Sequence, residues 1–157
     1  MPELRLATLA DDLLDAVVDA ATTLGIDLPA RRIIADGAVA WDCELVAVAL
    51  PTITRGTVGA DVSTQRHRAS DTYVAEYRLW VLRGVPMPAE DGSPPAAAKV
   101  TEAGKRLMDD GYLLTVGLRG HLATIGHSCQ SLAAGPCTAQ GPEGGLAGWS
   151  ATIRVGV

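Results

Sequence analysis

The alternation of apolar and polar residues is most regular in YVAEYRLWVLRG, residues 73–84. Odd-numbered positions from Tyr73 to Val81 are all apolar or aromatic. The even-numbered positions are mixed in character: Val74, Glu76, Arg78, Trp80 and Leu82. A period of two is typical of a β-strand, whose successive side chains point to opposite faces of a sheet. We expect the uniformly apolar face to contact helices and the mixed face to be only partly covered.

Two other segments have the apolar spacing of helices. The first begins near Thr8 and ends before Gly25, a residue that suits the end of a helix. The second is expected to follow Ser93 as N-cap and Pro94 as first helical residue, with a break near Gly111. Further strands are expected at Arg31–Asp36, Cys43–Leu50 and Trp149–Val155. Residues 117–136 show no pattern that decides between helix and strand.

Pro51 is expected to end the strand before it, because proline cannot donate a hydrogen bond to a central ladder. Residues 51–72 then form a long polar loop, and loops of this length inside a compact domain are usually functional. The order of elements predicts a single α+β domain over residues 1–157. In this domain two helices pack on one face of a mainly antiparallel sheet.

The composition is that of an ordinary globular protein, with 48% hydrophobic and 20% charged residues among 157. The net charge of −5 argues against a protein that binds nucleic acid by neutralising phosphates. Three cysteines without a CxxC pair indicate a reducing compartment. Because the chain shows neither a signal-peptide pattern nor a long apolar run, we expect a soluble intracellular protein that does not enter a membrane.

Asp42, Cys43 and Glu44 stand in a row before an apolar run. One interpretation is a thiol hydrolase in which Cys43 is the nucleophile and His67 the base. The neighbouring carboxylates oppose formation of a thiolate, however, and free cysteine is often buried. We therefore favour a structural Cys43 that fills space inside the sheet.

Four potential metal ligands lie close together in the sequence: His121, His127, Cys129 and Cys137. Their spacing matches no common zinc pattern, so we expect no metal site, although a zinc-binding module stays an alternative. The sequence contains no paired-carboxylate, Ser/His/Asp or nucleotide-binding pattern. This absence alone does not decide against an enzyme, because catalytic groups can come from distant segments of the chain.

Four segments carry a resemblance to a known family: LPARRIIADGAVAWDCELVAVAL, YVAEYRLWVLRGVPMP, DGSPPAAAKVTEAGKRLMDDGYLL and GPCTAQGPEGGLAGWSATIRVGV. Their order and spacing resemble the small tail-terminator, or head-to-tail joining, proteins of long-tailed actinobacteriophages. The resemblance covers most of the chain from Leu28 onwards. Because it consists of structural segments rather than a catalytic signature, another phage neck or tail-tube structural protein stays the main alternative.

The resemblance implies a ring, expected to be a hexamer, that caps the tail tube, stops its polymerisation and joins it to the head. The implied partners are further copies of the chain, the major tail tube protein and the head connector or stopper protein. Genomic DNA would pass through the lumen without sequence-specific binding. The resemblance also implies no catalytic residues and no cofactor, and hence a protein that is not an enzyme. The implied location is the head–tail junction of the virion, after assembly in the host cytoplasm.

A ring requires two different patches on each subunit. We expect one patch on the face that carries Glu76, Arg78 and Trp80, because an exposed tryptophan beside paired charges is common at interfaces. The sequence does not locate the opposing patch. A separate hypothesis is that the loop after Pro51 contacts the tube protein or projects toward the lumen; it contains the basic residues Arg55, Arg66, His67 and Arg68. Such a cluster is either a solvated loop or a contact for an acidic partner or for DNA.

Overall fold

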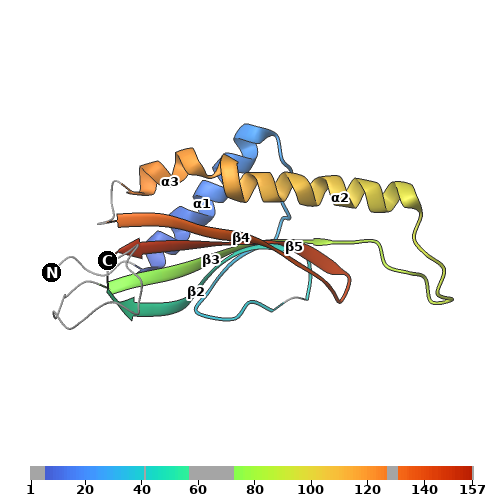
Figure 1. The fold of residues 1–157 in the computed structure, drawn as a ribbon, viewed down its shortest axis with the longest axis horizontal. Coiled ribbons are helices and arrows are strands. Elements are labelled where there is room, and N and C mark those ends of the chain that lie inside the picture. The colour runs from blue at the N-terminus through green and yellow to red at the C-terminus, as the bar shows by residue number, and fades with distance from the viewer. Residues whose placement is uncertain (1–5, 41, 57–72, 127–130, 157) are drawn as a thin grey trace.

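The structure is a computed structural model that describes residues 6–40, 42–56, 73–126 and 131–156. The helices are α1 (Leu6–Leu24), α2 (Ala97–Tyr112), the π-helical turn η1 (Leu113–Gly117) and α3 (Arg119–Gly126). The strands are β1 (Arg32–Ala35), β2 (Leu45–Arg55), β3 (Tyr73–Gly84), β4 (Ser131–Glu143) and β5 (Leu146–Gly156). The helices all lie on one side of a single sheet (Figure 1).

The sheet has five strands in the order β1-β2-β3-β5-β4. β1 runs parallel to β2, whereas every other neighbouring pair is antiparallel. The predicted class, an α+β fold with helices on one face of a mainly antiparallel sheet, is therefore confirmed. The described residues contain three α-helices rather than the expected two, because α3 falls in the region 117–136 that had no clear pattern.

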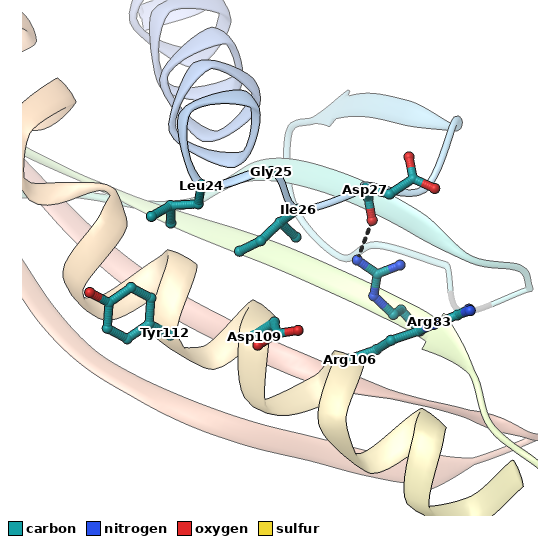
Figure 2. Close-up of a pocket in the computed structure, with 8 residues that line it drawn as sticks. All are labelled: Leu24, Gly25, Ile26, Asp27, Arg83, Arg106, Asp109 and Tyr112. Atoms are coloured by element: carbon teal, nitrogen blue, oxygen red, sulfur yellow. Dashed lines mark hydrogen bonds between the residues drawn. The ribbon is translucent and has the colours of Figure 1, made fainter.

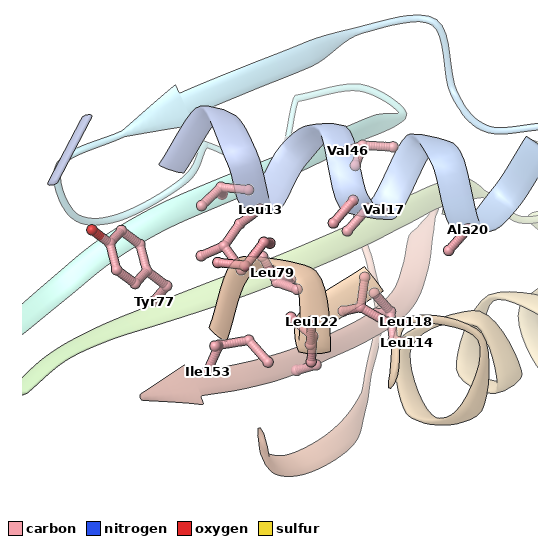
Figure 3. Packing of buried hydrophobic residues seen from close by; sticks show 14 of the residues in the cluster. Leu13, Val17, Ala20, Val46, Tyr77, Leu79, Leu114, Leu118, Leu122 and Ile153 are labelled. Atoms are coloured by element: carbon pink, nitrogen blue, oxygen red, sulfur yellow. The ribbon is translucent and has the colours of Figure 1, made fainter. Parts of the chain in front are cut away.

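β3 lies in the middle of the sheet, and its alternation sets the two faces as predicted. Ala75, Tyr77, Leu79 and Val81 are buried in the main core beneath the helices. Partner residues on β2 and β5 lie on the same side of the sheet and extend this core: Val46, Val48, Ala151, Ile153 and Val155. Figure 3 shows this layer of side chains between the sheet and the helices.

α1 covers the centre of the sheet because its apolar residues recur at helical spacing. Leu13, Val17 and Ala20 are buried against the strands (Figure 3). The hydroxyl of Tyr77 donates a hydrogen bond of 2.9 Å to the Leu6 carbonyl, which fixes the start of the helix. The described helix thus begins before Thr8, and the expected cap at that residue is wrong. Gly25 ends it with φ of 68°, as predicted.

Pro51 does not end β2, which continues to Arg55. The register between β2 and β3 shifts between Ala49 and Thr52, so Pro51 lies in a β-bulge. At a bulge the ladder is interrupted and the missing N–H of proline costs no hydrogen bond. The loop expected from residue 51 therefore starts later, and residues 57–72 lie outside the described part of the chain.

The second helix also differs from the expectation. It begins at Ala97 rather than after Ser93, whose amide donates instead to the Asp91 carboxylate at 2.9 Å. Its regular α-helical part ends at Tyr112, one residue after Gly111, and the chain continues as the π-helical turn η1, so the break expected near Gly111 is confirmed. Gly111 is buried and lies against Trp149. A Cβ atom at residue 111 would lie 2.9 Å from Cε2 of Trp149, so only glycine allows this contact.

The C-terminal hairpin is longer than the sequence pattern indicated. β5 begins at Leu146 instead of Trp149, and it pairs with the 13-residue strand β4. The Gly144–Gly145 turn between the two strands has φ of 57° and 79°. Two positive φ values are the requirement of the hairpin turn whose twist matches that of the strands.

Gly148 is a point where the sheet tolerates no side chain, because an added Cβ would meet the backbone of Val81 and Leu82. We predict that Gly148→Ala lowers the free energy of unfolding by about 1–3 kcal/mol. The matched control is Gly120→Ala in α3, where an added methyl meets nothing within 4 Å. That change should raise stability by about 0.5–1 kcal/mol. Urea unfolding of both variants measures the difference, and equal stabilities would contradict this packing.

Candidate functional site

The side of the sheet opposite the helices carries the residues that the sequence pattern singled out. We call it the open face. It consists of Glu76, Arg78 and Trp80 of β3 and Thr152 and Arg154 of β5. Glu76 faces Arg154 across the two strands, and Arg78 faces Thr152. All three β3 side chains are half-buried. The structure therefore brings these predicted residues together on one surface.

The charges of the open face are arranged differently from the expectation. Glu76 pairs with Arg154 at 3.0 Å rather than with Arg78. The Arg154 side chain is 55% exposed, so this ion pair contributes at most about 1 kcal/mol to stability. Its main effect is to leave Arg78 without a carboxylate partner among the described residues.

The guanidinium of Arg78 lies over the Trp80 ring, 5.8 Å from its centroid. This distance is within the range of a cation–π interaction, which holds the arginine against the sheet. The sequence suggested an exposed Trp80, but in the structure this side chain is half-buried. It packs against a small second core formed by Leu45, Ala47 and Leu82. The tryptophan is therefore a rigid, half-buried platform.

A hollow of about 500 Å³ lies beside this platform. Its lining includes the small β2 residues Ala49 and Pro51, and Ala38 and Val39 from the segment before β2. Arg78 and Trp80 complete its lining. The volume falls in the range of about 300–1,000 Å³ that is typical of ligand pockets. The hollow is thus apolar, with one positive charge.

Residues 37–39 border the hollow, and Arg31 contacts the chain just after them, at Asp42 and Cys43. Its Nη1 atom lies 2.8 Å from the Asp42 carboxylate and 2.7 Å from Sγ of Cys43. Both contacts raise the pKa of Arg31, and the hydrogen bond to Cys43 is the larger cause. Next in the chain, Glu44 accepts a hydrogen bond of 2.7 Å from the Gly84 amide. Cys43 is half-buried and contacts the Arg31 guanidinium. The expectation that it fills space inside the sheet is therefore wrong.

On the helix side, an ion pair that the sequence analysis missed joins β3 to α2. Nε and Nη2 of Arg83 lie 2.6 and 2.8 Å from the two carboxylate oxygens of Asp110. The Asp110 side chain is 0% exposed and that of Arg83 is 12% exposed. Burial raises the pKa of Asp110, an effect that Arg83 opposes, and the hydrogen bond to Asp110 raises the pKa of Arg83. The sequence signal that could have revealed this pair is Arg83, a charged residue at a position of β3 that faces the helices.

A second contact of Arg83 ties the end of α1 to the same point. Nη2 donates a hydrogen bond of 2.6 Å to the Asp27 carbonyl (Figure 2). A cavity of about 360 Å³ lies here between residues 24–27 and α2. Arg106, Asp109 and Tyr112 line its α2 side (Figure 2).

Of the four potential metal ligands, the two that the structure describes lie on different elements. His121 lies on α3 beside Asp12 and Asp15 of α1, whereas Cys137 lies on β4. Burial raises the pKa of Cys137. His127 and Cys129 lie outside the described residues. Within the part of the chain that the structure describes, no three His, Cys, Asp or Glu side chains are placed to hold a metal ion.

The basic residues after Pro51 are only partly described. Arg55 ends β2, and its guanidinium lies 5.8 Å from the centroid of the Tyr73 ring. Arg66, His67 and Arg68 lie outside the described residues, so the proposed Cys43–His67 pair has no described geometry.

Comparisons with known proteins add no family. A scan against protein-family models and a search of curated proteins each return no match. Among the described helices, none combines the length and the apolar character required to cross a membrane.

The buried ion pair supplies a test of this arrangement. We predict that Asp110→Ala lowers the free energy of unfolding by about 3–5 kcal/mol, because it leaves the Arg83 charge without its partner. Glu102→Ala is the control: it removes an ion pair with Arg106 whose side chains are 66% and 62% exposed. Its effect should not exceed about 0.5 kcal/mol. Chemical unfolding measures both, and similar losses would contradict the role of Asp110.

Proposed function

We propose that the protein is a structural virion protein, a tail terminator that forms a ring on the end of a phage tail tube. The observation that carries the proposal is the open face. It presents a tryptophan, an arginine and an apolar hollow on the one side of the sheet that the helices leave uncovered. Tryptophan and arginine are enriched in the centres of protein interfaces. The order of segments that resembles tail terminators gives the assembly its proposed identity.

The fold agrees with this function in a second way. A sheet with helices on one face has two unlike surfaces, and unlike surfaces are what a head-to-tail ring joins. In the proposed ring, identical subunits cap the tube, stop its polymerisation and join the head connector or stopper protein. DNA passes through the lumen, and no catalysis is required. Another neck protein or a tail-tube protein would use the same kind of surface, and the test below separates them.

Assembly is the property to measure. We predict that Trp80→Ala and Arg78→Glu each reduce ring formation by about tenfold or more, because both residues form the floor of the contact. Native mass spectrometry and negative-stain images of the purified chain, with and without tail tubes, report the ring. Lys99→Glu, an exposed charge reversal on α2, is the control and should assemble normally.

Two results would overturn the proposal. One is assembly of both open-face variants at the wild-type level. The other is polymerisation of the wild-type chain into long tubes by itself, which would indicate a tube protein instead.

The basic cluster after β2 provides a separate test. If Arg66 and Arg68 contact the tube protein or another acidic partner, the double change Arg66→Glu, Arg68→Glu should leave the thermal unfolding midpoint unchanged but block tail completion. Complementation of a terminator-defective phage measures this. Full complementation by the double variant would show that the cluster is only a solvated part of the surface.

A further inference from the structure

The helix α2 exposes an apolar surface that the chain itself does not cover. Only Asp110 and Gly111 of its 16 residues are buried. Met108 is 73% exposed, and Tyr112, four residues further along α2, is 52% exposed; Val116 of the following turn η1 is 45% exposed. Residues at this spacing lie on the same side of a helix. Together with Asp109 we call them the α2 patch.

The α2 patch carries one carboxylate, Asp109, and the hollow carries one guanidinium, Arg78. Asp109 is exposed and forms no ion pair with any other described residue. On the opposite side of the molecule, Arg78 lines the hollow and likewise has no carboxylate partner in the described part of the chain. The two surfaces are therefore complementary in charge, and each also carries apolar groups.

The two surfaces are also complementary in shape. Met108 has the largest exposed fraction among the exposed large hydrophobic residues, and it protrudes from a helix. The hollow of about 500 Å³ beside Trp80 is a recess lined mainly by small apolar side chains. A flexible methionine fits an irregular apolar recess and contacts an aromatic ring favourably.

One copy of the chain cannot bring these surfaces together. α2 lies on the helix side of the sheet (Figure 1), whereas Arg78 and Trp80 point away from the helices. Contact between the two surfaces therefore requires a second copy. Because the surfaces differ, the contact is head-to-tail, and repetition gives either a closed ring or an open filament.

We propose that the α2 patch of one copy docks into the hollow on the open face of the next copy. Met108 occupies the recess beside Trp80, and Asp109 forms an ion pair with Arg78 of the neighbouring copy. The inference rests on the proposed ring and locates both of the patches that such a ring requires. Its occupant is a second copy of this chain rather than a different partner, because both complementary surfaces belong to the same molecule.

A charge exchange tests this contact on the full chain. Arg78→Asp and Asp109→Arg should each weaken self-association about tenfold or more, because each places like charges together. The double variant restores the pair with its polarity reversed and should recover most of the wild-type association. Sedimentation equilibrium measures the association constants. Asp15→Arg, at an exposed position of α1, is the matched control and should associate as the wild type does.

Met108→Ser extends the test to the apolar part of the contact. Met108 is largely exposed, so this variant should fold normally and yet associate about tenfold more weakly. Circular dichroism establishes that each variant is folded.

The outcomes separate this inference from the proposed function. Normal association of Asp109→Arg and Met108→Ser, or a double variant that stays as weak as the singles, would overturn the contact with the α2 patch and leave the ring standing. Normal association of Arg78→Asp would count against the contact and, together with normal assembly of Trp80→Ala, against the ring as well. An open filament that depends on both residues would support the contact and overturn the terminator. A wild-type chain that stays monomeric even with tail tubes would overturn both.

Discussion

The buried ion pair between Arg83 and Asp110 fixes the one helix that packing alone holds poorly. α2 buries only Asp110 and Gly111, so few apolar contacts oppose its displacement. The two short hydrogen bonds between guanidinium and carboxylate define both the position and the rotation of the helix. Removing either partner leaves a charge in a dry environment, which makes any other placement of α2 unfavourable. The direction in which α2 presents Met108 and Asp109 therefore depends on this pair.

The second constraint is the alternation of β3. Its odd-numbered side chains complete the core, and Arg83 continues the same side to reach α2. Its even-numbered side chains lie on the opposite side, where Leu82 is buried in a small cluster with Leu45 and Ala47 and where Glu76, Arg78 and Trp80 are half-buried. Because one strand supplies both sides, a shift of register by one residue would exchange core and surface. The surface that we propose for assembly is thus a consequence of the same register that forms the core.

The sequence predicted those features that depend on local periodicity. The two faces of β3 follow from a period of two, and the first helix and its end at Gly25 follow from helical spacing and from the positive φ that glycine allows. Pro51 was misread because a bulge cannot be inferred from one strand; it depends on the register with the partner. Arg83 and Asp110 are 27 positions apart and meet only through the fold. Glu76 was likewise assigned to its sequence neighbour, although its partner Arg154 comes from another strand.

The internal ion pair and the proposed contact between copies involve residues of the same two elements, β3 and α2. Arg78 and Arg83 belong to the same strand, and Asp109 and Asp110 are consecutive in α2. Within one copy, the Arg83–Asp110 pair fixes how α2 lies relative to β3, and hence how the α2 patch lies relative to the hollow. In a head-to-tail assembly that relation sets the rotation from one copy to the next, and the rotation decides between a ring and a filament. A structural protein that must stop at a fixed number of copies needs such a relation to be rigid. The buried pair that stabilises the subunit would therefore also determine the number of copies in the proposed ring.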